Sequence, residues 1–261
     1  MKTSDFHKLI TDFFSIYLPA HRNFSKNTIS SYCDTFSLLF QYISVETKRP
    51  LERLDIKYIN SELIYSFLTW LEEKRHSSVA TINQRLSCFH TFFRYIQIVK
   101  PELSYEAQII LGIPFRKKPQ TTILYLTPDN IRLLLNQPDT STKRGRRNLT
   151  LLSLLYDSGA RVQEIADLTV ESVRLEPPAQ VKLIGKGSKA RVVPLMQNTV
   201  NLLKGYLEEN DLLLSHKFQF PLFSNSRNEK LTRAGISYIL GKYAIAAKKQ
   251  SNTFPEPNLI T

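Results

Sequence analysis

The sequence predicts a mainly α-helical protein of two domains, a helical bundle followed by an α+β domain that carries a small β-hairpin. The chain has 261 residues, more than one domain usually needs. Apolar residues recur at helical spacing through most of it, and two short runs rich in branched residues flank a glycine pair. We place the domains at 1–111 and 124–261, joined by a linker at 112–123.

Four helices are expected in the first domain. Their apolar stripes, with a period of three and four residues, cover 5–20, 25–48, 60–76 and 78–96. Pro19 is expected to end the first helix, and Ser25 and Asn60 or Ser61 are expected to cap the next two. The phenylalanines follow helical spacing, so we assign them to the core rather than to base stacking.

The linker and the second domain differ in character from the bundle. Pro101 stops the fourth helix, and the linker combines Gly and Pro with three consecutive cations at 116–118. Thr127 and Pro128 then start a helix. Further helices are expected at 147–157, 198–207 and 232–247, and a hairpin is expected where the runs 181–184 and 191–195 flank Gly-Lys-Gly-Ser-Lys.

Charge points to a polyanionic partner. The chain has 35 Lys and Arg against 23 Asp and Glu, a net charge of +12, which favours nucleic acid through counterion release. Charge alone is equally compatible with a basic protein of another kind. Between Pro177 and Leu207, however, there is no acidic residue. The predicted partner is therefore nucleic acid, and the basic hairpin region is a candidate contact surface.

Other classes of function lack their motifs. There is no Gly-rich phosphate loop, no metal-ligand spacing and no nucleophile elbow, so we expect no cofactor, no metal and no small-molecule substrate. Cys33 and Cys88 lie in apolar helical stretches and are interpreted as reduced core residues. No stretch resembles a signal peptide or a membrane span, so a cytoplasmic protein without a membrane partner is expected.

Three residues are candidates for chemistry. Arg161 lies where a Leu-rich helix meets Gly159 and a new helix begins, and a guanidinium fork matches two phosphate oxygens. Glu164 follows one turn later and could orient it. Lys186 lies on the hairpin turn, where an ammonium could protonate a leaving oxygen. The simpler interpretations are a surface ion pair and a lysine kept for solubility.

Further DNA contacts are predicted from basic and amide side chains. In the first domain they lie at two helix starts, and in the second they surround the hairpin and precede the Leu-rich helix. The candidates are Lys26, Asn27, Thr28, Asn83, Arg85, Arg144, Arg146, Lys189 and Arg191. Each is also acceptable as an ordinary exposed residue, and the cluster at 143–147 could equally be a solvated loop.

Four segments in the correct order resemble the tyrosine recombinase (phage integrase) family. Ser-Gly-Ala-Arg-Val-Gln-Glu-Ile at 158–165 resembles its first catalytic box, and 185–195 is similar to its lysine hairpin. The segments 25–32 and 80–95 resemble a Xer-type core-binding domain. The resemblance implies a four-helix SAM-like core-binding domain joined to a recombinase catalytic domain of α+β type.

In that family a tyrosine attacks a DNA phosphodiester to form a 3′-phosphotyrosyl bond. Two arginines stabilise the negative charge on the phosphate, and the hairpin lysine protonates the leaving 5′ oxygen. The reaction needs no metal and no nucleotide. Carried over, Arg161 is the first arginine, Glu164 its acidic companion and Lys186 the lysine. The family's His-x-x-Arg box and nucleophilic tyrosine have no match before Thr261; Tyr238 and Tyr243 precede their expected place.

We therefore expect a catalytic domain that is cut short, and a chain that binds DNA without cleaving it. It would act as a recombinase or integrase through self-association or beside a full-length recombinase. Two alternatives remain open. One is a regulatory protein that occupies recombination sites, and the other is a helical protein whose basic hairpin contacts RNA.

Overall fold

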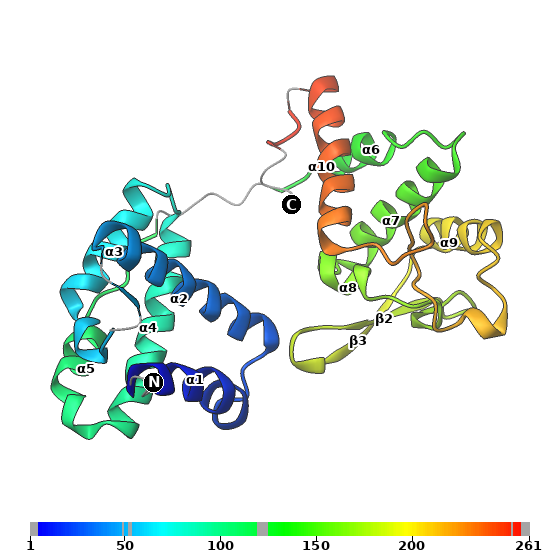
Figure 1. Ribbon diagram of the computed structural model, residues 1–261. Helices are drawn as coiled ribbons and strands as arrows, with labels where there is room; N and C mark the ends of the chain where they lie inside the picture. The colour runs from blue at the N-terminus through cyan, green and yellow to red at the C-terminus, as the bar shows by residue number, and fades with distance from the viewer. Residues whose placement is uncertain (1–4, 49, 52–53, 119–124, 252, 257–261) are drawn as a thin grey trace. The chain divides into compact units, whose positions relative to one another are not determined.

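The computed structural model describes residues 5–48, 50–51, 54–118, 125–251 and 253–256, except for the side chain of Lys186. The chain divides into two compact units, Met1–Thr121 and Thr122–Thr261, which Figure 1 shows as a helical unit and a mixed unit. Each unit is described by itself. Part of the predicted linker, residues 119–123, lies outside the described residues.

The first unit is built from helices around α4. Its elements are α1 (Asp5–Asp12), the π-helical segment η1 (Phe13–His21), α2 (Lys26–Glu46), η3 (Ile56–Tyr58), α3 (Ser61–Glu73), α4 (Val79–Val99), η4 (Pro101–Leu103) and α5 (Ser104–Leu111). Helix α4 contacts α2, α3, α5 and η1. This all-α architecture confirms the predicted class of the domain.

Polar side chains start these helices where the sequence predicts. The Ser25 hydroxyl accepts a hydrogen bond from the Thr28 backbone N–H at 3.3 Å. Asn60 Oδ1 accepts one from Leu63 N at 2.9 Å, and Ser78 Oγ accepts one from Thr81 N at 3.2 Å. Each bond satisfies a backbone donor that has no partner inside the helix.

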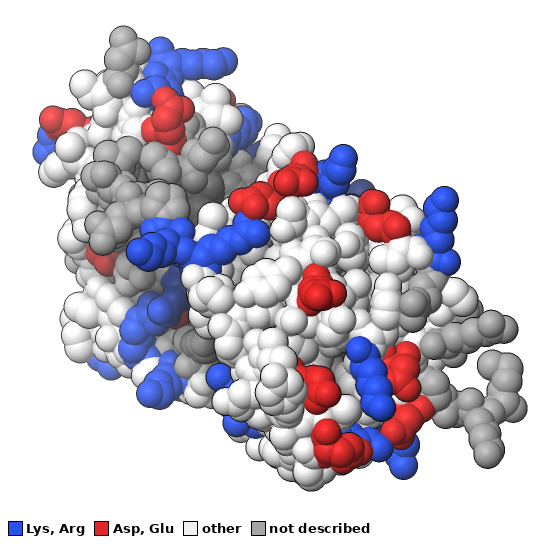
Figure 2. Space-filling view, turned by 90° about the vertical axis from the view of Figure 1, so that its left-hand side faces the viewer, with Lys and Arg blue, Asp and Glu red and all other residues white. Residues whose placement is uncertain are grey.

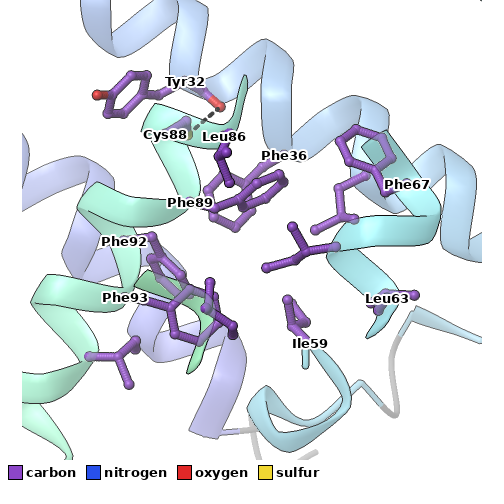
Figure 3. Packing of buried hydrophobic residues seen from close by; sticks show 14 of the residues in the cluster. Tyr32, Phe36, Ile59, Leu63, Phe67, Leu86, Cys88, Phe89, Phe92 and Phe93 are labelled. Carbon is purple, nitrogen blue, oxygen red and sulfur yellow. Dashed lines mark hydrogen bonds between the residues drawn. The ribbon is translucent and has the colours of Figure 1, made fainter. Parts of the chain in front are cut away.

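Aromatic rings fill the core between α2, α3 and α4 (Figure 3). The rings of Phe36 and Phe92 meet edge to face with centroids 5.1 Å apart, and Phe67 meets Phe89 at 5.8 Å. Such pairs add to the free energy gained by burying the rings. Cys88 is buried beside them, with its thiol 3.9 Å from the Tyr32 carbonyl oxygen. The assignment of the phenylalanines to the core is confirmed.

Three expectations for this unit were wrong. The first helix does not end at Pro19, because its hydrogen-bond register widens into the π-helical segment η1, and that segment contains the proline and runs to His21. A helix after Pro101, α5, was not predicted. Cys33 is exposed rather than buried, since it lies on the outer face of α2 while its neighbour Tyr32 faces the core.

The second unit packs helices against a small antiparallel sheet of order β1-β2-β3. Its elements are α6 (Pro128–Leu135), α7 (Lys143–Ser158), α8 (Val162–Ala166), η5 (Val170–Ser172), β1 (Val173–Arg174), β2 (Gln180–Ile184), η6 (Lys186–Ser188), β3 (Ala190–Pro194), α9 (Gln197–Glu209), η7 (Ser215–Lys217) and α10 (Arg233–Gln250). Helix α7 contacts α9, and α8 contacts both β2 and α10. The predicted hairpin is confirmed, with Ile184 paired to Ala190.

Helix α7 begins earlier than expected. Thr142 caps it by accepting a hydrogen bond from Gly145 N at 3.0 Å, so the basic cluster at 143–147 lies on the first turns of a helix and not on a loop before it. The helix ends at Gly159, whose φ of +56° is a left-handed conformation that favours glycine. Within the described ranges, none of the helices has the length and apolar character needed to cross a membrane.

Candidate nucleic-acid interface

Arg161 lies at the junction of α7 and α8. Gly159 ends α7 in a left-handed conformation, and Arg161 then occupies the position just before the first residue of α8. Its side chain is 72% exposed. The guanidinium is therefore accessible to an incoming phosphate.

Glu164 holds this arginine from behind. Its Oε2 accepts a hydrogen bond from the Arg161 backbone N–H at 2.8 Å, and its Oε1 accepts one from Arg161 Nη1 at 3.0 Å. An acidic residue that reaches back to the start of its helix satisfies a free backbone donor there. Only 4% of the Glu164 side chain is exposed, so the pair is not the ordinary surface ion pair that the spacing alone would allow.

Arg191 reaches the same carboxylate from strand β3. Its Nη1 donates to Glu164 Oε1 at 2.9 Å and its Nη2 to Oε2 at 2.7 Å, which is a two-pronged pairing with good geometry. The hydrogen bonds from Arg191 are the largest cause that lowers the pKa of Glu164 to about 2, and those from Arg161 contribute further. Burial acts in the opposite direction, because it disfavours the charged carboxylate. The carboxylate thus ties the hairpin to the start of α8.

Gly185 lets the hairpin come this close. A methyl group on its α-carbon would lie 2.9 Å from Glu164 Oε1 and 3.7 Å from Arg161 Nη1. The first distance is shorter than a carbon–oxygen contact allows without movement of the hairpin or the carboxylate. The sequence signal for this residue was the glycine itself, which we had assigned to turn geometry alone.

Lys186 follows Gly185 in the hairpin turn. Its backbone forms the first residue of η6, and the turn is closed by a hydrogen bond from Gly185 N to Lys189 O of 2.8 Å. Two residues of the turn have positive φ, Gly187 at +74° and Ser188 at +57°. The Lys186 side chain lies outside what the structure describes, so its role as the hairpin lysine stays a prediction. Lys189 is exposed on the turn.

The other basic candidates of the second unit separate into two kinds. Arg144 is exposed on the first turn of α7. Arg146 forms an ion pair with Glu209 of α9, and its Nη1 donates to the carbonyl oxygens of Thr140 and Ser141 at 2.8 and 3.0 Å. These contacts hold Arg146 against the protein, so it has less freedom than Arg144 to meet a DNA phosphate.

The candidates of the first unit separate in the same way. Lys26 and Asn27 are exposed on the first turn of α2, beside Thr28, whose hydroxyl lies 3.0 Å from Ser25 Oγ. Asn83 exchanges hydrogen bonds with the Arg116 backbone at 2.8 and 2.9 Å. Arg85 donates to Ser31 O and Thr35 Oγ1, both at 2.8 Å.

Asn83 and Arg85 thus hold parts of the protein together, a role that their sequence positions alone did not indicate.

Surface charge is mixed on one face of the protein: on the face seen in Figure 2, Lys and Arg are interspersed with Asp and Glu.

Two family descriptions match the chain. Residues 125–257 match the phage integrase family, and residues 11–97 match the phage integrase N-terminal SAM-like domain. The integrase/recombinase y4rC of Sinorhizobium fredii (strain NBRC 101917 / NGR234) is 35% identical over 243 residues, which cover 93% of this chain and 72% of the relative.

Tyrosine recombinase XerD of Listeria innocua serovar 6a (strain ATCC BAA-680 / CLIP 11262) is 30% identical over 234 residues, covering 89% of this chain and 75% of XerD. Among solved structures, a lambda integrase dimer bound to a COC′ core site has the same fold, with a TM-score of 0.62 at 15% identity over 96% of this chain and 82% of that one. The chain belongs to the phage integrase family, the family of the tyrosine recombinases.

Proposed function

We propose that these 261 residues bind duplex DNA as a site-specific recombinase or integrase does, with Arg161 and Lys186 at one backbone phosphate, and that they do not cleave it alone. The observation that carries the proposal is the anchoring of an exposed guanidinium by a carboxylate that is almost fully buried. An arginine held in this way loses little conformational freedom when a phosphate arrives.

The charges around Glu164 favour an anion. Two guanidiniums share one carboxylate, so the cluster keeps a net positive charge before Lys186 and Lys189 are counted. Since Arg191 uses both terminal nitrogens on Glu164, Arg161 is the more available of the two arginines. A phosphate would therefore meet Arg161 directly, while Arg191 keeps the hairpin in place.

The relatives support duplex DNA as the ligand. The lambda integrase structure is of a dimer bound to a DNA core site, and XerD is named a tyrosine recombinase. We extend both features to this chain as proposals: it binds a duplex site, and it does so with a second copy or with a full-length recombinase beside it. Lys26, Asn27 and Thr28 of the first unit are proposed to contact the same duplex.

The proposal that cleavage does not begin rests on the tyrosines and histidines present. His216 is the last histidine, and the residue three positions later is Gln219. The Tyr243 hydroxyl is buried and accepts a hydrogen bond from Asn148 Nδ2 at 2.9 Å. Tyr238 is exposed but lines a cavity beside the first turn of α7, whereas Arg161 follows the last turn. Neither tyrosine is proposed as the nucleophile.

A suicide DNA substrate tests both parts of the proposal. The 261-residue chain is incubated with nicked duplex carrying a Xer-type site, and samples are run on native and on denaturing gels beside a complete tyrosine recombinase. We expect a shifted band on the native gel and no covalent adduct on the denaturing gel. A covalent adduct would overturn the proposal that the chain does not cleave DNA alone. If an equal amount of duplex RNA abolishes the shifted band, the proposal of duplex DNA binding is overturned.

A further inference from the structure

A second cationic site lies at the opposite end of α7 from Arg161. A cavity of about 570 Å³ opens there between α7, α9, the 224–228 turn and α10. Its lining includes the basic residues Lys143, Arg144 and Arg147 and the apolar or aromatic residues Tyr206, Leu231, Tyr238 and Ile239. Among the residues that the structure describes, no Asp or Glu lines it. The volume is in the range of cavities that bind small molecules or side chains.

The cations are placed where a helix does not favour them. Lys143, Arg144 and Arg147 occupy the first turns of α7, and no acidic residue lies in its first turn. The positive end of the helix dipole disfavours cations at this position and favours carboxylates. A sequence that breaks a local rule in this way often does so at a functional site.

Arg147 carries a charge that is half-buried in the cavity wall. It donates to Asn148 Oδ1 at 2.8 Å and to the Ser224 carbonyl oxygen at 2.8 Å, which are both uncharged acceptors. Burial, followed by repulsion from Arg144, lowers the pKa of its guanidinium. Over the described part of the chain, no carboxylate forms an ion pair with Lys143, Arg144 or Arg147; the nearby Glu209 pairs with Arg146 and interacts with Lys143 only through their charges. A negatively charged occupant would compensate this charge.

We propose that this cavity binds an acidic segment of a partner protein, in which carboxylates flank one apolar side chain. The carboxylates would meet Lys143, Arg144 and Arg147, and the apolar side chain would contact Leu231, Tyr238 and Ile239. A DNA backbone is a poorer match, because phosphate contacts gain nothing from an apolar wall and a duplex presents a convex surface. The positive cavity also attracts an acidic partner from a distance.

The site goes beyond the proposed DNA binding, and it assigns Arg144, one of the candidate DNA contacts, to a protein partner instead. Lys143 and Ser158 are the first and last residues of α7, and a helix of that length spans about 24 Å. A partner seated beside Lys143 therefore leaves Arg161 and the hairpin free. The two sites can be tested independently on the same protein.

Fluorescence anisotropy on the full 261-residue chain tests the proposal. The probe is a fluorescein-labelled peptide in which glutamates flank a single phenylalanine, and its control has glutamine in place of every glutamate. We expect the acidic peptide to bind and the glutamine peptide to bind at least about tenfold more weakly, the effect of losing one charge-assisted contact. Failure of the acidic peptide to bind, or equal binding of both peptides, overturns the proposal.

Charge reversal locates the binding. Lys143→Glu with Arg144→Glu should weaken the acidic peptide about tenfold or more, whereas Lys204→Glu, an exposed control on α9 outside the cavity, should leave it within about twofold. Both replaced residues are exposed, and glutamate suits the start of a helix, so the variant should keep its melting temperature. Tyr238→Ala removes an exposed part of the apolar wall and should also weaken the peptide.

Unchanged peptide affinity in both variants overturns the proposal. A second outcome also overturns it: the charge-reversal variant loses duplex DNA affinity as much as peptide affinity, and duplex DNA displaces the peptide. The cavity would then belong to the DNA-binding surface. Loss of peptide binding in Tyr238→Ala, with duplex DNA affinity retained, supports the cavity as a separate protein-binding site. That result stands whether or not the proposed DNA function holds.

Discussion

Glu164 joins two arginines that lie 30 residues apart: its Oε1 accepts from Arg161 Nη1 at 3.0 Å and from Arg191 Nη1 at 2.9 Å. The carboxylate is buried, whereas Arg161 is mostly exposed. One ion thus fixes the start of α8, the direction of an exposed guanidinium and the position of the hairpin. Because Arg191 is engaged with Glu164, we expect its substitution to act through the hairpin.

Replacement of Glu164 by glutamine should destabilise the second unit by about 1–3 kcal/mol, because the buried side chain loses its charge-assisted hydrogen bonds to two arginines that are at least partly exposed. Denaturant unfolding followed by circular dichroism measures this. The matched control is Asp129→Asn, whose exposed pairing with Arg132 should contribute less than about 1 kcal/mol. Equal effects of the two substitutions would contradict the central place of Glu164.

The same carboxylate predicts a pH dependence. The pKa of Glu164 is about 2 in the folded protein against an ordinary value of 4.5, so the unfolded state binds the proton more readily. Its contribution to stability is fully present above about pH 4.5 and is lost as the pH falls toward 2. The difference in unfolding free energy between the wild type and Glu164→Gln should shrink over this range. A difference that does not change with pH would contradict the assignment.

Gly185→Ala should weaken duplex DNA binding with little loss of helix content. The added methyl group meets Glu164 Oε1 at 2.9 Å, which pushes the hairpin away from Arg161. Gly205→Ala is the control, because a methyl group there meets nothing within 4 Å and alanine favours a helix by about 0.5–1 kcal/mol. Gel shift and thermal melting of both variants measure the effects; unchanged DNA affinity in Gly185→Ala would count against the close approach.

In the first unit, two predicted DNA contacts should behave differently. Arg85→Ala removes hydrogen bonds to Ser31 O and Thr35 Oγ1 that join α4 to α2, and should lower the stability of that unit by about 1–3 kcal/mol. Lys26→Ala changes an exposed side chain and should weaken duplex binding without lowering the melting temperature. A stable Arg85→Ala variant with strongly reduced DNA affinity would reverse our interpretation of Arg85.

The periodic signals in the sequence predicted most of the fold. Capping residues such as Ser25 and Thr127 and the glycine-flanked hairpin appear where expected, because these signals act over a few residues. Pro19 and the start of α7 were misjudged, since a widened register can absorb a proline and a Thr142 cap can start a helix with cations. The widened register is not visible in the local pattern, whereas Thr142 is a local capping signal that the cations after it obscured.

The candidate site was predictable in part. Spacing and resemblance indicated Arg161, Glu164 and Lys186. The bond from Arg191 to Glu164 joins residues 27 positions apart, so it follows from packing and not from any local pattern. The same is true of Asn83, whose partner Arg116 lies 33 positions away. Sequence alone indicated the types of residue at the site but not which of them hold the others in place.

A double-mutant cycle on duplex DNA affinity most directly tests whether Arg161 and Lys186 meet one backbone phosphate. The affinities of Arg161→Ala, Lys186→Ala and the double variant are measured at several salt concentrations. If both cations meet one phosphate, each single substitution lowers the salt slope by about one and the two effects are coupled by more than about 0.5 kcal/mol. Additive effects, or single variants that bind duplex DNA as tightly as the wild type, would contradict it.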